Sequence, residues 1–221
     1  MSEVLALTKL KMLLTGLKSF LSRKVLRTDR SRWNYQYDKG LWNGLENMDE
    51  LARFSVLAGY VQFLKPNNPS ILEVGCGEGI LAQRIGRQHY SSFLGTDVAN
   101  TAIEQAIQRF GDDQTRFEAI DMNVHQPNEK FDVIIFNEAI YYLKPMLDKL
   151  IFQYVPMLKL NGLLIISMNT GRHADGDAKW EQIEKAFTVV DSSFIETAKN
   201  GWKIKVLRPL PVEERQNSSL N

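Results

Sequence analysis

Hydrophobic and polar positions follow two different periods along this chain. Short, almost continuous apolar runs, such as Val133-Ile-Ile-Phe136, alternate with longer stretches in which apolar residues recur every three or four positions. Short continuous runs are typical of strands buried on both faces, and the three-to-four step is typical of amphipathic helices. The pattern predicts strands at residues 71–74, 92–97, 115–121, 131–137, 163–168, 188–197 and 202–208.

Helices are predicted between and before these strands. One face of residues 47–64 is apolar, and Pro66 and Pro69 follow it as stop signals. Thr101 and Glu104 form a capping-box pattern that opens a later helix. The same period predicts further helices at residues 80–87, 101–110, 145–155 and 177–187. By contrast, we expect residues 28–45 to form a loop rich in aromatic side chains.

Strands that alternate with helices are expected to form parallel βαβ units. The prediction is therefore an α/β fold, a doubly wound, seven-stranded and mostly parallel sheet. Residues 198–201 are too few for a crossover connection, so the last strand should be antiparallel. We expect the sheet domain to span residues 31–210, with residues 211–221 as a flexible tail.

The first thirty residues differ from the rest of the chain. Leucines recur there at helical steps, which predicts an amphipathic helix over residues 1–30 as an N-terminal extension. Residues 1–32 hold eight Lys and Arg and two acids, a net charge of +6. The remainder holds 19 basic and 24 acidic residues, a net charge of −5. The overall net charge of +1 thus averages a basic helix and an acidic body.

Two interpretations of this helix stay open. A basic amphipathic helix can contact an anionic membrane surface, here through residues 1–28, or it can pack on its own domain or on a partner. Lysines interrupt its apolar stretches and no small-residue cleavage site follows, which is unlike a secretory signal peptide. No apolar run approaches the roughly 20 residues of a membrane span. We expect a cytoplasmic protein, peripherally membrane-associated under the first interpretation.

Cysteine and histidine usage narrows the chemistry. The chain has a single cysteine, Cys76, and three histidines whose spacing does not suit metal ligands, namely His89, His125 and His173. These counts exclude a disulfide framework and a cysteine-based zinc site, and we expect no metal. The acidic body also disfavours nucleic acid as a partner, because a phosphate backbone needs a basic surface.

The most informative stretch is Glu73-Val-Gly75-Cys-Gly77-Glu-Gly79, where a predicted strand runs into three alternate glycines and then a helix. Glycines let a ligand approach the backbone closely, because no Cβ stands in the way. Ligands of doubly wound sheets bind at the carboxyl ends of the strands. The spacing G-x-G-x-G differs from the G-x-G-x-x-G of dinucleotide-binding folds, which makes a nicotinamide dehydrogenase a distant alternative.

Two further acids end predicted strands. Asp97 ends the second strand, 24 residues after Glu73, and a carboxylate there can accept hydrogen bonds from both hydroxyls of a ribose. Asp121 ends the third strand, where it can accept a hydrogen bond from the exocyclic amine of adenine. Three acids on successive strands beside a glycine turn favour one ligand site over three unrelated strand ends.

Five segments match the motifs of one known family: residues 73–79, 96–97, 119–122, 131–138 and 158–166. With them the sequence, from about Trp33 to Arg208, resembles the class I S-adenosylmethionine-dependent methyltransferases. The likeness is greatest to the compact small-molecule (type 11/12-like) branch, which includes saccharide- and nodulation-factor-tailoring enzymes. The resemblance implies a Rossmann-like methyltransferase fold, S-adenosyl-L-methionine as cofactor and S-adenosyl-L-homocysteine as product. The candidate cofactor-binding residues are Tyr37, Glu73, Gly75, Gly77, Gly79, Asp97, Val98, Asp121, Met122 and Asn137.

The resemblance also implies that the residues after the fourth strand border the site of methyl transfer. Methyl transfer from a sulfonium depends largely on alignment of the reactants, and an acceptor hydroxyl would gain from a general base. The candidate catalytic residues are Glu138, Tyr141 and His173, with His125 as a further candidate. The aromatic segment near the N-terminus is expected to close over the site, with Tyr35 or Tyr37 reaching it. The candidate substrate-binding residues are Trp33, Tyr35, Trp42 and Tyr142, although Tyr141 and Tyr142 could equally be core residues.

The sequence therefore predicts an enzyme that transfers a methyl group from S-adenosylmethionine to an oxygen or nitrogen of a small molecule. A sugar, an amine or a natural-product intermediate would suit. Asn137-Glu-Ala-Ile140 lacks the [DN]-P-P-[YF] pattern of enzymes that methylate the amino groups of bases. Two alternatives stay open: a protein- or RNA-directed methyltransferase, and a cofactor-binding protein without turnover.

Overall fold

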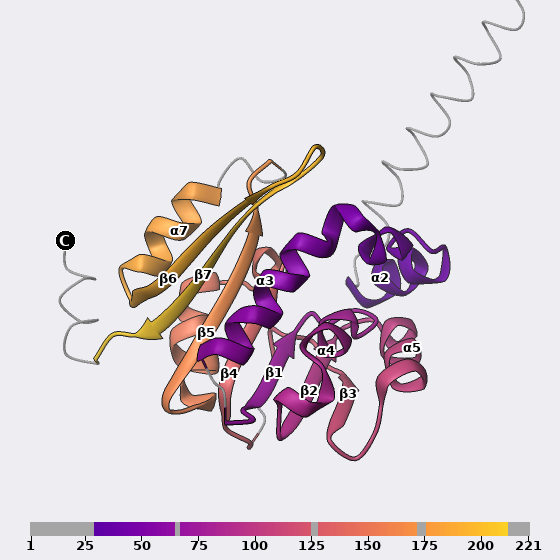
Figure 1. Cartoon of the computed structure of the whole chain (residues 1–221), viewed down its shortest axis with the longest axis horizontal. Helices are drawn as coiled ribbons and strands as arrows, with labels where there is room; N and C mark the ends of the chain where they lie inside the picture. The colour runs from indigo at the N-terminus through magenta and orange to yellow at the C-terminus, as the bar shows by residue number, and fades with distance from the viewer. Residues whose placement is uncertain (1–28, 65–66, 125–127, 172–175, 212–221) are drawn as a thin grey trace, which may run out of the picture.

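The computed structural model describes residues 29–64, 67–124, 128–171 and 176–211. Within them the chain forms a seven-stranded sheet in the order β3-β2-β1-β4-β5-β7-β6 (Figure 1). Strands β1 to β5 run parallel, whereas β7 lies antiparallel between β5 and β6. The predicted doubly wound α/β fold with an antiparallel end is confirmed. The strands are β1 (Ser70–Val74), β2 (Ser92–Asp97), β3 (Thr115–Ala119), β4 (Phe131–Asn137), β5 (Leu158–Asn169), β6 (Phe187–Glu196) and β7 (Gly201–Pro209).

Helices cover both faces of this sheet. The longer ones are α2 (Asp29–Asp38), α3 (Met48–Leu64), α5 (Asn100–Phe110) and α7 (Gly176–Glu184). The short helical segments are η1 (Asn43–Glu46), α4 (Ile80–Ile85), η2 (Arg87–His89), η3 (Ile140–Tyr142), α6 (Met146–Lys149), η4 (Leu150–Tyr154) and η5 (Val155–Met157). Among the described helices, none has the combined length and apolarity needed to cross a bilayer.

The central strands are apolar on both sides because each side packs on its own core. Ile71 and Ile135 belong to a cluster with Leu57 of α3 and residues of α4. Their neighbours in sequence, such as Leu72, belong to a second cluster with Trp180 of α7. Successive strand residues point to opposite faces, so two buried faces require the continuous apolar runs seen in the sequence.

Strand β1 lies at the point where the strand order reverses. Leu72 of β1 is paired with Leu94 of β2 on one side and Ile134 of β4 on the other. The chain builds outward from β1 to β3 and then returns to place β4 beside β1. In open α/β sheets, ligands bind outside the carboxyl ends of the strands at this reversal.

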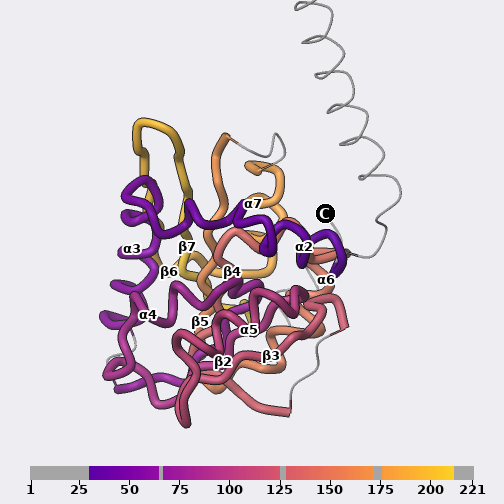
Figure 2. Tube along the Cα trace, turned by 90° about the vertical axis from the view of Figure 1, so that its right-hand side faces the viewer, coloured from indigo at the N-terminus to yellow at the C-terminus, as the bar shows by residue number. Residues whose placement is uncertain are grey.

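The N-terminal part of the domain corrects one prediction. Residues 28–45 were expected to form a loop, but α2 and η1 occupy most of this segment. Trp33 and Tyr37 are one helical turn apart on α2 and both turn inward, while the residues between them are polar or exposed. Those intervening residues hide the helical period in the sequence. Helix α2 packs against α5, and Figure 2 shows the chain passing from α2 over the edge of the sheet to α3.

Two other helices differ from their predicted form. The helix expected over residues 80–87 ends at Ile85, because Gly86 adopts a φ of +84°. The helix expected over residues 145–155 is α6 followed by the π-helical η4 and the 3₁₀ turn η5, in which Pro156 lacks the backbone N–H that a regular helix needs.

Candidate functional site

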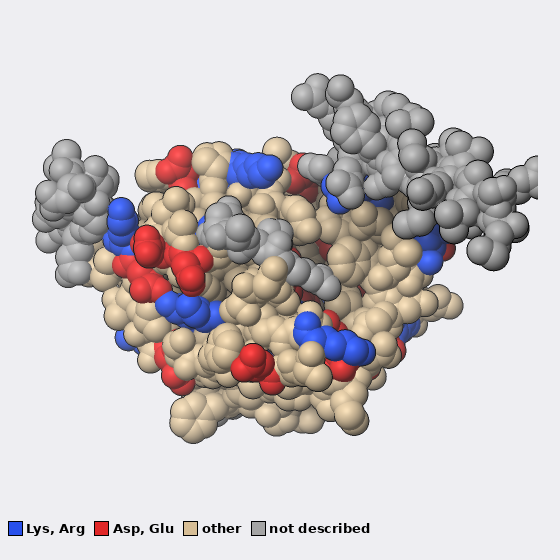
Figure 3. Space-filling model, turned by 90° about the horizontal axis from the view of Figure 1, so that it is seen from above, with Lys and Arg blue, Asp and Glu red and all other residues tan. Residues whose placement is uncertain are grey.

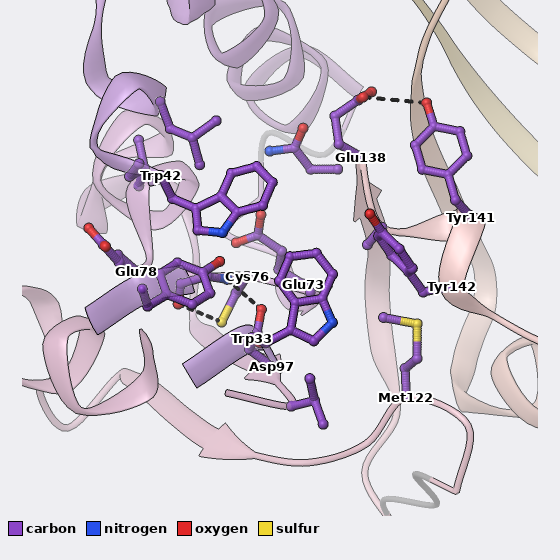
Figure 4. Close-up of a pocket in the computed structure, with 18 of the residues that line it drawn as sticks. Trp33, Trp42, Glu73, Cys76, Glu78, Asp97, Met122, Glu138, Tyr141 and Tyr142 are labelled. Carbon is purple, nitrogen blue, oxygen red and sulfur yellow. Dashed lines mark hydrogen bonds between the residues drawn. The ribbon is translucent and has the colours of Figure 1, made fainter. Parts of the chain in front are cut away.

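A cavity opens at the carboxyl ends of β1, β2 and β4, at the reversal of strand order. Figure 4 shows Glu73, Cys76 and Asp97 at its inner wall. Trp33 and Trp42 approach from one side, and Tyr141, Tyr142 and Met122 from the other. The cavity therefore joins the glycine turn, the fourth-strand segment and the aromatic N-terminal segment, as the sequence predicts.

The glycine turn brings backbone rather than side chains to the inner wall. Gly75 and Gly77 have φ values of +76° and +52°, which only glycine adopts at little cost. A Cβ on Gly75 would stand 2.5 Å from the Cβ of Ala139, and one on Gly77 would stand 2.7 Å from the Tyr37 hydroxyl. Gly79 does not line the cavity. A Cβ there would meet the Phe117 ring at 2.8 Å, so this glycine allows close packing instead.

Asp97 connects the end of β2 to the glycine turn. Its Oδ2 accepts a hydrogen bond from the Gly77 N–H at 3.0 Å, and its Oδ1 accepts one from the Ala99 N–H at 2.9 Å. Burial raises the pKa of Asp97, and the backbone N–H donors partly offset that rise. Each carboxylate oxygen has two lone pairs, so Asp97 can still accept hydrogen bonds from a ligand's hydroxyls.

Glu73 is a buried acid in the cavity wall. Its side chain is 1% exposed, and Oε2 has no hydrogen-bond partner among the described residues. Burial raises the pKa of Glu73 to about 8, although a hydrogen bond from Asn137 and the charge of Arg53 act in the opposite direction. A buried acceptor without a partner is costly, so this oxygen is suited to a donor on a ligand.

Arg53 of α3 is a cavity residue that the sequence analysis missed. Its guanidinium is 2% exposed, donates to Glu50 Oε2 from Nη2 at 2.8 Å, and donates to Asn137 Oδ1. Because a guanidinium has five N–H donors, donors remain beyond those contacts. The signal in the sequence is a charged residue four positions before Leu57 on the apolar stripe of a predicted helix.

The segment after β3 closes another side of the cavity. Asp121, Met122 and Asn123 all line it. Asp121 Oδ1 accepts the Asn123 N–H at 2.8 Å, and the Met122 carbonyl accepts the Tyr154 hydroxyl at 2.8 Å. These contacts fix the loop that carries Asp121. The strand expected over residues 115–121 ends at Ala119, so Asp121 lies two residues beyond β3 rather than at its end.

Glu138 follows β4 in a conformation unusual for its residue type, with a φ of +61°. Its Oε1 accepts the Ser167 hydroxyl at 2.8 Å and its Oε2 accepts the Tyr141 hydroxyl at 3.3 Å. Tyr141 in turn accepts the Asn169 N–H at 2.5 Å. Burial raises the pKa of Glu138, while the charge of Arg53 lowers it. The two candidate catalytic residues Glu138 and Tyr141 are thus in contact at the cavity wall.

The aromatic candidates fall on two sides of α2. Trp33 and Tyr37 line the cavity together with Trp42, and Trp33 meets the Tyr142 ring edge-on at a centroid distance of 5.1 Å. The structure does not bring Tyr35 to the cavity: its side chain is 55% exposed. Two residues along a helix correspond to about 200° of rotation, which places Tyr35 on the face opposite Trp33 and Tyr37.

Trp42 supplies a second buried polar atom without a partner among the described residues, its indole Nε1–H. One orphaned donor and one orphaned acceptor, Glu73 Oε2, therefore belong to residues of the same cavity. Arg53 adds a buried positive charge nearby, which acts on the Glu73 carboxyl. This set suits a ligand that carries both an ammonium group and a carboxylate.

The remaining candidate residues lie partly in the cavity wall and partly outside the described residues. Val98 and Asn137 line the cavity as expected. His125 and His173 lie outside the described residues, as do residues 1–28 with the proposed membrane contact and most of the 211–221 tail.

Within the described ranges, no group of three His, Cys, Asp or Glu side chains is placed to hold a metal ion. Figure 3 shows acidic and basic side chains interspersed over the described part of the upper face.

The chain is similar to known methyltransferases. A sequence family described as a methyltransferase domain matches residues 72–164. The structure resembles the N-methyltransferase NodS of Bradyrhizobium japonicum WM9 bound to S-adenosyl-L-homocysteine, with a TM-score of 0.67, 21% identity, and coverage of 81% of this chain and 99% of that one. It also resembles magnesium protoporphyrin IX methyltransferase of Synechocystis PCC 6803 with bound S-adenosylmethionine, with a TM-score of 0.63, 17% identity, and coverage of 81% and 94%.

Curated relatives match over shorter stretches. Malonyl-[acyl-carrier protein] O-methyltransferase of Acetivibrio thermocellus is 31% identical over 154 residues, which are 66% of this chain and 50% of that protein. Ribosomal protein L11 methyltransferase of Helicobacter pylori (strain Shi470) is 28% identical over 103 residues, 45% of this chain and 31% of that protein. The chain thus spans 31% to 50% of the length of these relatives.

Together, the family match and the fold confirm the resemblance read from the sequence. Residues 72–164 match the model of a methyltransferase domain, the fold is the class I, Rossmann-like fold of methyltransferases, and the cofactor of such enzymes is S-adenosylmethionine. The cavity fits such a group. It provides a glycine cradle that a Cβ would fill, strand-end acids for hydroxyl donors, and orphaned polar atoms beside a buried arginine.

Proposed function

We propose that this chain, whose centre is a methyltransferase domain, transfers a methyl group from S-adenosylmethionine to an oxygen or nitrogen of a small-molecule acceptor. The observation that carries the proposal is the orphaned Glu73 carboxylate oxygen in a cavity floored by Gly75 and Gly77. When bound there, the cofactor would supply an already activated methyl group, so the protein's task is largely to align the acceptor.

The cofactor's polar groups each have a matching side chain. Glu73 would accept hydrogen bonds from the methionine ammonium, and Arg53 with the Trp42 indole N–H would hold the carboxylate. Asp97 would use its free lone pairs to accept hydrogen bonds from the ribose hydroxyls. Asp121 would accept a hydrogen bond from the adenine amine. Gly77 cannot carry a side chain because the Tyr37 hydroxyl lies against it. These roles add Arg53 to the candidate residues and give Trp42, a candidate for substrate binding, a role in cofactor binding instead.

The acceptor end is supported by the residues that follow β4. Glu138, Tyr141 and Tyr142 line the cavity opposite the aromatic side chains of the N-terminal segment. Glu138, whose pKa burial raises, is the candidate proton acceptor. Tyr141 would position it through their hydrogen bond. Trp33 and Tyr142 would flank the acceptor, and the proposed role of His173 rests on the sequence alone.

Small-molecule acceptors are favoured by two kinds of support. The structural neighbours named above include an N-methyltransferase and a porphyrin methyltransferase. The aromatic side chains of Trp33 and Trp42 also narrow the approach to the cavity, which suits a compact acceptor. The similarity to ribosomal protein L11 methyltransferases makes a protein acceptor the second candidate.

Calorimetric titration tests the proposal directly. We expect S-adenosylhomocysteine to bind at a single site and NAD not to bind. Transfer of labelled methyl groups from S-adenosylmethionine would then be screened over sugars, amines, acyl-carrier-linked acids and ribosomal protein L11. Absence of S-adenosylhomocysteine binding to the folded protein would refute the proposal, and transfer to protein alone would select the second candidate.

A further inference from the structure

The cavity lining is strongly acidic. The lining contains one arginine, Arg53, and a larger number of acids. The acids are Glu50, Glu73, Glu78, Asp97, Asp121 and Glu138. Two of these acids are paired with arginines, Glu50 with Arg53 and Glu78 with Arg109. Clefts lined by charge of one sign concentrate ligands of the opposite sign. The cavity therefore favours cationic groups, and one acid lies away from the proposed cofactor contacts.

That acid is Glu138, and its placement is specific. A φ of +61° costs a glutamate on the order of 1 kcal/mol, and such strain persists where surrounding contacts impose it. Here the imposing contacts are the fully buried Ser167, whose hydroxyl donates to Oε1, and Tyr141, whose hydroxyl donates to Oε2. These contacts hold the carboxylate at the wall where the fourth-strand segment borders the cavity.

Aromatic rings complete this end of the cavity. Trp33 and Tyr142 are in edge-to-face contact, and Tyr141 and Tyr142 have ring centroids 6.3 Å apart. Trp and Tyr faces attract a cation that lies within about 6 Å of the ring centroid. A carboxylate beside such faces is a site for an ammonium group rather than for a neutral hydroxyl.

The proton acceptors in the lining also favour an ammonium group over a neutral hydroxyl. Within the described lining, the side chains that can accept a proton near neutral pH are carboxylates, and no histidine or lysine is among them. An alkylammonium has a pKa of about 10, which is close enough for a carboxylate of raised pKa to relay its proton. An alcohol is a far weaker acid than an alkylammonium, so the same carboxylate is much less suited to take its proton.

We propose that the acceptor is an amine, which enters as its ammonium form and is held by the Glu138 carboxylate at the end of the cavity that Trp33 and Tyr142 line. This rests on the proposed methyltransferase function and narrows its acceptor. The ammonium gives one proton to Glu138, and the nitrogen lone pair forms the new carbon–nitrogen bond. The carbon–sulfur bond breaks with its electron pair, so the sulfonium leaves as the neutral thioether. The methylated product carries the positive charge and loses its next proton to solvent.

The probe for this inference is sinefungin, an analogue that carries an ammonium group where S-adenosylmethionine carries its methylsulfonium. Its affinity is compared by calorimetry with that of neutral-thioether S-adenosylhomocysteine, for the full chain and for Glu138→Gln. We expect Glu138→Gln to lower the sinefungin-to-S-adenosylhomocysteine affinity ratio by about tenfold, because a charge-assisted contact becomes a neutral one. The control Glu104→Gln, an exposed acid on α5, should leave the ratio unchanged.

Other outcomes separate the hypotheses. A ratio that Glu138→Gln leaves unchanged overturns the amine inference, whereas failure of the parent protein to bind either compound overturns the proposed function itself. If Glu138→Gln does not fold, Tyr142→Leu, at a side chain 42% exposed, should lower the same ratio, and no change there overturns the inference. A labelled-methyl screen compares amines with alcohols that have the same carbon skeleton. Transfer to the alcohols alone overturns the amine inference as well.

Discussion

Asp97 and Gly77 are joined by a hydrogen bond of 3.0 Å from the glycine N–H to the carboxylate, so the acid at the end of β2 also shapes the turn after β1. One side chain thus links the proposed ribose contact to the backbone cradle. Loss of its charge should therefore affect both ligand binding and stability, which separates Asp97 from a simple surface acid.

For Asp97→Asn we expect S-adenosylhomocysteine affinity to fall by about 10- to 100-fold and the free energy of unfolding by about 1–3 kcal/mol. The amide keeps the shape but replaces one acceptor by a donor that faces the Gly77 or Ala99 N–H. Calorimetry and urea unfolding measure the two effects. Asp177→Asn, at a side chain 91% exposed, is the matched control and should change neither.

Gly77 should tolerate no side chain, for two separable reasons. Gly77→Ala must hold a φ of +52° and must displace the Tyr37 hydroxyl, which lies 2.7 Å from the added Cβ. We expect a loss of about 2 kcal/mol in unfolding free energy and weaker S-adenosylhomocysteine binding. Tyr37→Phe in the same chain removes the hydroxyl and should recover part of the loss. Additive effects of the two substitutions would show that the contact is unimportant.

A glycine elsewhere provides the opposite expectation. Gly59 lies within α3, and among the described residues no atom outside the helix's own nearby backbone lies within 4 Å of an added Cβ. Gly59→Ala should therefore raise the free energy of unfolding by about 0.5–1 kcal/mol, because alanine has the higher helix propensity. Thermal unfolding followed by circular dichroism measures it. Equal destabilisation by Gly59→Ala and Gly77→Ala would contradict the distinction drawn between the two positions.

The fold was readable from the sequence, whereas parts of the site were not. Val133-Ile-Ile-Phe136 predicts a central strand because both faces of the sheet are buried. Gly75 and Gly77 predict the cradle because few turns place glycines at that spacing after a strand. The contact between Glu138 and Ser167 depends instead on the register of β4 against β5, which pairs Asn137 with Ser167, and no local pattern encodes that register.

Arg53 and α2 were missed for different reasons. Arg53 lies on the apolar stripe of a correctly predicted helix, and a buried charge there was a signal that a partner or ligand should exist. Helix α2 is short and rich in polar residues, so its stability comes from packing on α5 and around the cavity rather than from propensity. Only the spacing of Trp33 and Tyr37 indicated its inward face.

Arg53 gives a prediction specific to the carboxylate of the ligand. Arg53→Met should lower the affinity for S-adenosylhomocysteine by about 100-fold. The affinity for 5′-methylthioadenosine, which lacks the amino-acid end, should stay nearly unchanged. Removing the arginine also leaves the partly buried Glu50 without its cation, so the double variant Arg53→Met/Glu50→Gln is the better-folded comparison. Equal losses for the two ligands would assign Arg53 a structural role only.

The buried Glu73 predicts how stability depends on pH. Its pKa is about 8 in the folded protein and about 4.5 ordinarily, so between these values the folded chain holds a proton that the unfolded chain has released. Stability from this group is therefore fully present below about pH 4.5 and is lost as the pH rises through about 8. Asp97 faces Glu73 and opposes its ionisation, while Arg53 and Asn137 favour it.

Raising the pH from 5 to 8 should thus lower the free energy of unfolding of the ligand-free protein by on the order of 3 kcal/mol. Glu73→Gln should reduce that dependence without abolishing it, because burial also raises the pKa of Asp97 and Glu138. Urea unfolding at the two pH values measures the slope. A parent slope of the opposite sign, or an unaltered slope in Glu73→Gln, would show that Glu73 is ionised in the folded protein.

The two faces of α2 give the last prediction. Trp33 lines the cavity and contacts Tyr142, whereas Tyr35 is exposed, with the Lys39 ammonium 5.8 Å from the centroid of its ring. Trp33→Ala should lower the affinity for S-adenosylhomocysteine or for the acceptor by about tenfold, since an aromatic contact in a cavity contributes about 1–1.5 kcal/mol. Tyr35→Ala should leave both affinities within about twofold, because exposed contacts contribute little. Comparable losses in the two variants would mean that α2 matters through its fold alone, and losses only in Tyr35→Ala would place the ligand-facing side of α2 opposite to the one described.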